Sequence, residues 1–210
     1  ARIKICGMTR ADDIAAAVAA GVDAVGLVFY PSSPRHVSID TAAQLASLAP
    51  AFVSTVALFV DPDTAFVEEV IARVQPDLLQ FHGNESEAFC DGFSRSYIKA
   101  LRVKDAATLA AQARAYPSAR ALLLDSHSDS APGGTGEQFD WALIPGDLRQ
   151  RIILAGGLSA DNVGAAVERI QPYAVDVSSG VEKARGEKDP AAIRQFVEQV
   201  QQACGRCSQE

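Results

Sequence analysis

The chain has 210 residues and a mass of 22.1 kDa, which suits one large domain or two small ones and excludes a disulfide-stapled peptide. With 48% apolar and 21% charged residues, its composition is that of a folded globular protein rather than a disordered chain. The formal net charge of -7 repels phosphate backbones and anionic lipids, so we expect neither nucleic acid nor a membrane as a partner.

The first residues alternate polar and apolar side chains, as in a β-strand. They lack the apolar stretch of a signal peptide, and no apolar run approaches the roughly 18 residues that span a bilayer. We therefore expect a cytoplasmic protein in a reducing compartment, where its four cysteines are thiols.

Short runs rich in Val, Ile, Leu and Phe alternate with segments of helical periodicity along the whole chain. The runs predict strands at residues 2–5, 24–29, 53–60, 78–81, 97–100, 121–124, 152–155 and 174–177. The segments between them predict helices at 11–20, 41–48, 64–74, 86–93, 106–115, near 140–143, at 161–170 and at 190–204. Thr9 with Asp12 is typical of a capping box, Asp63 and Asp189 precede helices, and Gly21 follows one.

Strands that alternate with helices predict a parallel sheet covered by helices. Eight such units of about 26 residues fit a single α/β domain, a (β/α)8 TIM barrel over residues 1–203. The remaining residues, 204–210, are expected to form a solvated tail without a function. The alternative is an open doubly wound sheet, but the first strand-to-helix turn, Cys6-Gly-Met-Thr9, lacks the G-x-G-x-x-G pattern of that fold.

The carboxyl ends of the last two strands carry small residues that suit a phosphate group. Gly156 and Gly157 precede a helix, and Ser179 and Gly180 follow the eighth strand. Glycines allow close approach of the backbone, and barrels recurrently bind phosphate after strands seven and eight. The alternative is that these glycines only make tight turns.

Two other strand ends carry candidate acid and base groups. Cys6 lies on the face of Lys4, which points to the barrel axis if Ile3 and Ile5 face the helices, so Cys6 is either a catalytic thiol or an inert buried cysteine. Asp125 ends the most apolar strand, where burial favours the protonated form that a general acid needs. The alternative for Asp125 is a turn residue that caps the next loop.

Three further residues near strand ends have two interpretations each. Arg35 either clamps a carboxylate with its fork or is a solvated charge. His82, on the same face as Gln80, either contacts a ligand or is structural. Lys99 either forms a Schiff base or pairs with a neighbouring strand. The segment 126–136 is either a lid or an ordinary loop.

The other His and Cys residues do not form a metal motif. His36 and His127 lie in loops without ligand spacing, and Cys204 and Cys207 form a single C-x-x-C without a second pair. We expect no bound metal.

Five motifs together resemble the phosphoribosylanthranilate isomerase family, in its order and spacing, from Ile3 to about Val200. They are Lys4-Ile-Cys-Gly-Met-Thr9, Gly26-Leu-Val-Phe-Tyr-Pro31 with Ser33-Pro-Arg35, Gln80-Phe-His-Gly83, Gly133-Gly-Thr-Gly136 with Phe139-Asp-Trp141, and Asp176-Val-Ser-Ser-Gly-Val-Glu182. The resemblance implies a barrel enzyme of tryptophan biosynthesis. It would convert N-(5-phosphoribosyl)anthranilate into 1-(2-carboxyphenylamino)-1-deoxyribulose 5-phosphate without metal or cofactor.

The resemblance also implies roles for particular residues. The catalytic cysteine falls on Cys6, the catalytic aspartate on Asp125, and the arginine that faces the substrate carboxylate on Arg35. The phosphate-binding residues fall on Gly156, Gly157, Ser179 and Gly180. We further expect His82 and Asp176 to contact the substrate, a small phosphosugar-anthranilate, and the chain to be a monomer or a weak homodimer.

The chemistry of such a reaction agrees with these roles. An Amadori rearrangement needs an acid to open the furanose ring and a base to remove the proton from C2. The iminium forms on the substrate itself, so no lysine of the protein is needed. Two other functions remain open, a Schiff-base lyase that uses Lys99 and a phosphometabolite sensor that needs neither Cys6 nor Asp125.

Overall fold

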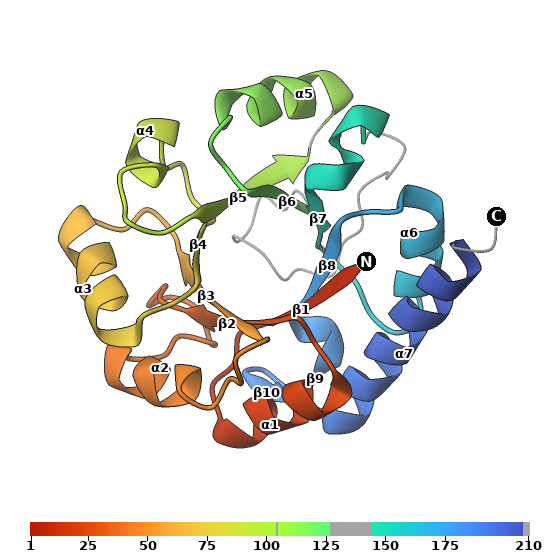
Figure 1. The fold of residues 1–210 in the computed structure, drawn as a ribbon, viewed down its shortest axis with the longest axis horizontal. Coiled ribbons are helices and arrows are strands. Elements are labelled where there is room, and N and C mark those ends of the chain that lie inside the picture. The colour runs from red at the N-terminus through yellow and green to blue at the C-terminus, as the bar shows by residue number, and fades with distance from the viewer. Residues whose placement is uncertain (104, 127–143, 208–210) are drawn as a thin grey trace.

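The computed structural model describes residues 1–103, 105–126 and 144–207. In this part of the chain, eight parallel strands pair in sequence order, and the eighth pairs with the first to close a barrel (Figure 1). The strands are β1 (Arg2–Cys6), β2 (Ala24–Val28), β3 (Ser54–Phe59), β4 (Leu78–Phe81), β5 (Tyr97–Val103), β6 (Ala121–Ser126), β7 (Ile152–Leu154) and β8 (Ala174–Val177). The predicted barrel is confirmed, with small shifts at the strand ends.

Helices surround this barrel (Figure 1). The α-helices are α1 (Ala11–Ala20), α2 (Ile39–Ala46), α3 (Thr64–Val74), α4 (Glu87–Cys90), α5 (Ala106–Ala115), α6 (Val163–Ile170) and α7 (Pro190–Cys207). Two 3-10 helices, η2 (Gly146–Arg151) and η3 (Ser179–Val181), and a hairpin of β9 (Glu182–Ala184) and β10 (Glu187–Lys188) complete the described elements. The helix predicted near 140–143 lies outside the described residues.

Helix ends follow local side-chain chemistry in most cases. The carboxylate of Asp63 accepts a hydrogen bond from the Phe66 N–H at the start of α3, and Gly21 ends α1 in the left-handed conformation. The capping box predicted at Thr9 and Asp12 is wrong, because α1 begins without a side-chain cap. The Thr9 hydroxyl instead donates to the Gly186 carbonyl, which ties this turn to the β9–β10 hairpin.

The barrel strands separate two apolar layers, as their alternation requires. Side chains such as Ile3, Ile5 and Leu79 face the helices and belong to the main core. A smaller set fills the barrel interior: Val56, Ile98, Ala100, Ala121, Leu123, Ile153, Ala155 and Ala174. Next to this interior set, Cys6 packs with Val28 and Leu58 at the carboxyl ends of the strands. This packing places the Cys6 thiol inside the barrel, as predicted.

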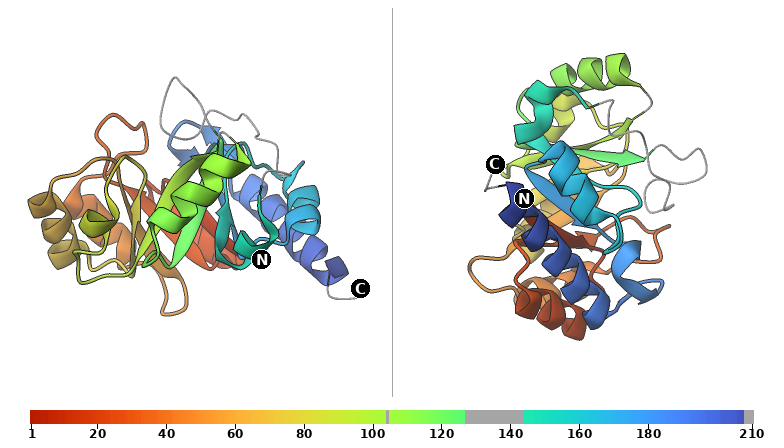
Figure 2. Two further views of the ribbon diagram at one scale, coloured as in Figure 1. Left: turned by 90° about the horizontal axis from the view of Figure 1, so that it is seen from above. Right: turned by 90° about the vertical axis from the view of Figure 1, so that its right-hand side faces the viewer.

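Helix α7 is longer than predicted and corrects the expected tail. It continues to Cys207, so residues 204–207 form its last turn, in which Gly205 and Arg206 are exposed. Ala203 is buried, and Cys204 is half-buried against the main core. Two views show α7 lying along the outside of the barrel (Figure 2). In the described part of the chain, no helix is both long and apolar enough to span a bilayer.

Candidate active site

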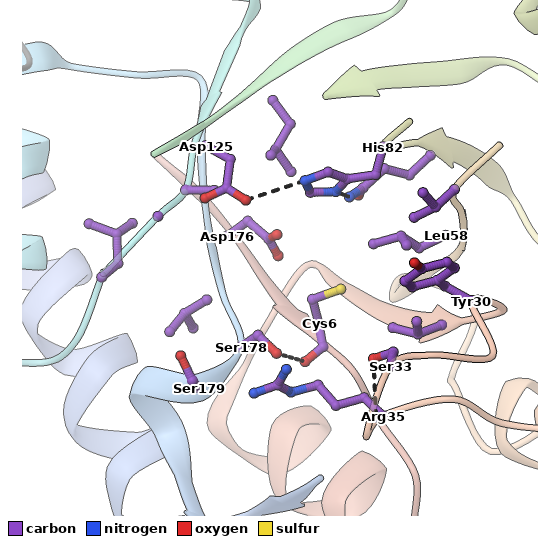
Figure 3. Close-up of a pocket in the computed structure, with 18 of the residues that line it drawn as sticks. Cys6, Tyr30, Ser33, Arg35, Leu58, His82, Asp125, Asp176, Ser178 and Ser179 are labelled. Atoms are coloured by element: carbon purple, nitrogen blue, oxygen red, sulfur yellow. Dashed lines mark hydrogen bonds and ion pairs between the residues drawn. The ribbon is translucent and has the colours of Figure 1, made fainter. Parts of the chain in front are cut away.

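A cavity of about 390 Å³ opens at the carboxyl ends of the barrel strands (Figure 3). Eight of the nine predicted site residues line it: Cys6, Arg35, His82, Asp125, Gly156, Gly157, Asp176 and Ser179. The ninth, Gly180, is exposed and follows Ser179 directly in η3. Barrel closure thus brings together side chains from strand ends and loops that are far apart in the sequence.

Cys6 is a buried thiol at the mouth of the barrel. Gly26 of the neighbouring strand makes room for it, since a Cβ atom at that position would lie 2.8 Å from the Cys6 Sγ. Burial raises the pKa of Cys6, while the positive charges of Lys4 and Lys188 oppose that rise. The thiol therefore stands in a poorly solvated place with two ammonium groups that favour its charged form.

Lys4 and Asp176 form a buried ion pair beside Cys6. The Lys4 Nζ donates to the Asp176 Oδ1 at 2.8 Å, and the two residues are register partners on β1 and β8. Burial alone would lower the pKa of Lys4, but the charges of Asp176 and Cys6 hold it above its ordinary value. Burial raises the pKa of Asp176, and Lys4 limits the rise. Asp176 also lines the cavity, so it is available to a ligand.

Asp125 is linked to two side chains at the end of β4. The His82 Nε2 lies 3.2 Å from the Asp125 Oδ2, and the Gln80 Nε2 lies 3.3 Å from the His82 Nδ1 (Figure 3). The His82 ring thus lies on the cavity wall between Gln80 and Asp125, and the sequence did not indicate its contact with Asp125.

Arg35 is not a solvated surface charge, because its guanidinium group already binds a carboxylate of the protein. Its Nε and Nη2 donate to the two carboxylate oxygens of Glu182 at 2.7 and 2.8 Å. Glu182 also accepts from the Lys188 Nζ at 2.8 Å. Burial acts to raise the pKa of Glu182, but the hydrogen bonds from Arg35 and Lys188 bring it below its ordinary value. Sequence reasoning missed Lys188, which lies in a charged turn segment typical of a protein surface.

The loops after β7 and β8 form a compact glycine-rich edge of the cavity. Gly156 and Gly157 have positive φ angles of 79° and 64°, which side chains other than glycine rarely adopt. The Asn162 side chain donates to the Gly157 carbonyl at 2.8 Å and accepts from the Ser159 N–H at 2.9 Å. A Cβ atom at Gly180 would lie 1.9 Å from the Leu158 carbonyl oxygen, so this glycine allows the two loops to pack.

Lys99 is held away from this chemistry. It is buried, and its Nζ donates to the Glu85 Oε2 and to the Gly83 carbonyl, both at 2.7 Å. It does not belong to the described residues that line the cavity. The structure therefore confirms the ion-pair interpretation and offers no support for a Schiff base on Lys99.

Two other expectations concern metals and a lid. Within the ranges that the structure covers, no three His, Cys, Asp or Glu side chains are grouped to hold a metal ion. The expected lid at 126–136 falls almost wholly outside the described residues, as does the Gly133–Gly136 motif.

A family model described as N-(5'-phosphoribosyl)anthranilate isomerase matches residues 3–199 of the chain. The chain belongs to this family. Isomerases of that name from Pseudomonas fluorescens Pf-5 and Thiobacillus denitrificans are 54% and 53% identical to it over 202 and 199 residues. These matches cover 96% and 95% of this chain and 96% and 97% of the relatives.

Solved structures of the family agree with the barrel. The isomerase from Thermotoga maritima superposes with a TM-score of 0.88 at 36% identity and covers 96% of this chain and 98% of its own. A family structure in complex with reduced 1-(o-carboxyphenylamino)-1-deoxyribulose 5-phosphate gives 0.84 at 35% identity, with the same coverage. The present chain is accordingly a phosphoribosylanthranilate isomerase, which performs the Amadori rearrangement of N-(5-phosphoribosyl)anthranilate in tryptophan biosynthesis.

Proposed function

We propose that this isomerase uses Asp125 as its general acid and Cys6 as its general base. The observation that carries the proposal is that both groups line one cavity, from β6 and β1. Asp125 protonates the ring oxygen of the substrate, the C1–O bond breaks, and the nitrogen lone pair forms the iminium. The Cys6 thiolate then removes the C2 proton, and the C2–H electron pair neutralises the iminium. The resulting enol tautomerises to the ketone product.

The charges around Cys6 suit the second step. A thiol is a weak base until it ionises, and burial disfavours ionisation. The ammonium groups of Lys4 and Lys188 oppose this effect, and the substrate iminium adds a further positive charge when it forms. The thiolate form of Cys6 is therefore favoured at the stage of the reaction in which the C2 proton is removed.

We also propose an orientation for the substrate. The anthranilate carboxylate lies on Arg35, in the loop after β2, and the phosphate lies on Gly156, Gly157, Ser179 and Gly180. Arg35 supplies a cation, and the glycine edge supplies backbone N–H groups in a chain whose net charge is -7. His82 and Asp176 contact the sugar between these two ends.

A spectroscopic assay on phosphoribosylanthranilate, run with and without borohydride, tests this mechanism against a lysine-based one. We expect turnover and no covalent adduct between substrate and protein, because the iminium forms on the substrate. A borohydride-trapped adduct on Lys99 would replace the proposal with Schiff-base chemistry.

We further propose that the chain is a cytoplasmic monomer or weak homodimer. A family structure from Thermotoga maritima is of monomers generated from a dimeric isomerase. In this chain Phe52, in the loop between α2 and β3, is 97% exposed and could bury its ring against a second copy. Sedimentation at increasing concentration should show weak association that a Phe52→Ser variant loses. Association that is unchanged in this variant would place the contact elsewhere.

A further inference from the structure

Two cations share one carboxylate at the edge of the active site. Glu182 accepts from Arg35 at 2.7 and 2.8 Å and from the Lys188 Nζ at 2.8 Å. The three side chains are 14% exposed for Arg35, 5% for Glu182 and 0% for Lys188, so water screens them poorly. With all three ionised, this triad carries one excess positive charge.

Because Lys188 is buried, its positive charge reduces the free energy of unfolding. Its side chain is fully buried, and its Nζ also donates to the Ser178 carbonyl at 3.1 Å. Burial lowers the pKa of Lys188, while Glu182 opposes that effect. Asp13 of α1 accepts a hydrogen bond from the Lys188 backbone N–H, and its carboxylate also interacts with the charge of the Lys188 ammonium. An apolar side chain would fill the same space without the cost of burying a charge.

The excess positive charge of the triad lies where the proposed orientation places the anthranilate carboxylate of the substrate. Arg35 extends from the loop after β2 past Cys6 toward Ser178, and it lines the cavity (Figure 3). With only Glu182 as a neighbour, its charge would be largely cancelled before a substrate arrived. Because Lys188 takes a share of the same carboxylate, Arg35 keeps a net attraction for a second anion.

We infer that Lys188 is a positioning residue for substrate binding, which acts through Glu182 to keep Arg35 attractive to the anthranilate carboxylate. The inference rests on the proposed orientation of the substrate. It differs from a purely structural role, in which Lys188 and Glu182 only brace Arg35 in place.

The hypothesis that Lys188 acts through its charge and the hypothesis that it only holds Arg35 in place predict opposite results for a double variant. Lys188→Met brings the triad to zero, Glu182→Gln brings it to +2, and the two changes together restore +1. If charge matters, the double variant binds a carboxylate better than Lys188→Met alone. If bracing matters, it binds at least as poorly, because a second contact has been lost.

The experiment is a calorimetric titration with two ligands that differ only in the carboxyl group. One is reduced 1-(2-carboxyphenylamino)-1-deoxyribulose 5-phosphate and the other is its phenylamino counterpart. Selectivity, the ratio of their Kd values, is measured at pH 6, where Cys6 is a thiol and adds no charge. Lys183→Met is the matched control, since Lys183 is an exposed lysine of the same hairpin that pairs with Glu187.

We expect Lys188→Met to lower the selectivity about tenfold, the double variant to recover it to within about threefold of the wild type, and Lys183→Met to leave it unchanged. A double variant as poor as Lys188→Met would overturn the inference in favour of bracing. If Lys188→Met fails to fold, the Glu182→Gln variant decides between the two hypotheses. The charge hypothesis predicts that Glu182→Gln has a higher selectivity than the wild type, and the bracing hypothesis predicts a lower one. A wild type without selectivity would instead show that the proposed orientation is wrong.

Discussion

His82 and Gln80 form a chain of contacts that ends at Asp125, the proposed acid. The contacts from Gln80 to His82 and from His82 to one carboxylate oxygen of Asp125 restrict the orientation of this carboxyl group. The proposed acid is thus oriented before the substrate binds, and such preorganisation contributes to the rate of a reaction.

An Asp125→Asn variant should lose about 10²- to 10⁴-fold in kcat, because an amide keeps the shape of the carboxyl group but cannot deliver a proton. Affinity for the reduced product analogue should change little. Steady-state kinetics and calorimetry measure the two effects. Asp12→Asn, which makes the same substitution at an exposed position in α1, is the control. If Asp125→Asn keeps the wild-type kcat, the acid lies elsewhere, and His82 would be examined next.

The pH dependence of Cys6 follows from its surroundings. Burial raises the pKa of Cys6, so alkylation by iodoacetamide should speed up as the pH rises through a midpoint above the ordinary thiol value of about 8.5. Below that midpoint the thiol is protonated and slow. The alkylation of Cys6 is followed by mass spectrometry of the Cys6 peptide, which separates it from the other three cysteines. A midpoint well below 8.5 would mean that Lys4 and Lys188 outweigh burial.

The positions of single site residues were predictable where the alternation of a strand determines the direction of the side chain. Cys6 and Asp125 were identified from strand ends and alternation, and both line the cavity. The pairing of Arg35 with Glu182 was not predictable, because it joins residues 147 positions apart that meet only when the barrel closes. Lys188 was missed because its burial depends on how the β9–β10 hairpin, to which it belongs, packs on the loop after β8, where Lys188 contacts Ser178.

The loop after β2 should serve one end of the substrate only. Arg35→Ala should weaken binding of carboxylate-bearing ligands by about 1.5 to 3 kcal/mol and leave inorganic phosphate unaffected. Arg35→Lys should recover only part of the loss, because lysine lacks the planar fork that Glu182 holds. Calorimetric titration of both ligands measures this, with exposed Arg185→Ala as the control. Equal losses for phosphate and for the full analogue would reverse the proposed orientation.

The loops after β7 and β8 depend on a glycine for their contact. Gly180→Ala should cost about 1 to 3 kcal/mol of unfolding free energy and weaken inorganic phosphate binding about tenfold, because its Cβ atom meets the Leu158 carbonyl. Chemical denaturation and phosphate titration check the two effects. Gly205→Ala is the control, since nothing lies within 4 Å of its added Cβ. A stable variant with normal phosphate affinity would remove Gly180 from the phosphate site.

Element boundaries were less predictable than element order. The bounds of α1, α3 and α5 agree with their periodicity, whereas α4 shortens to Glu87–Cys90 and α7 extends to Cys207. Such ends depend on packing, which periodicity does not report. The Thr9 capping box failed because the Thr9 hydroxyl bonds to the Gly186 carbonyl, a partner from the other end of the chain.

Closure of the barrel joins the reaction groups into one site. The pairing of β1 with β8 sets Lys4 beside Asp176, and the order of the strands places Cys6 and Asp125 on the same cavity. Eight alternating units predicted this architecture, because parallel strands with covering helices have few ways to bury both faces of the sheet. The contacts across the mouth of the barrel could not be predicted from the sequence, since they depend on loop conformation.

The turnover number of a Cys6→Ser variant tests most directly whether the closed barrel supplies a thiolate base to the substrate. Serine nearly keeps the size of cysteine but does not ionise in the working pH range, so kcat should fall at least about 10²-fold. Affinity for the reduced product analogue should stay close to that of the wild type. The control is Cys90→Ser at a second buried cysteine, whose pKa is raised to about 12 by burial and which lies outside the residues that line the cavity. A Cys6→Ser variant that retains kcat within about tenfold of the wild type would contradict the assignment of Cys6 as the base.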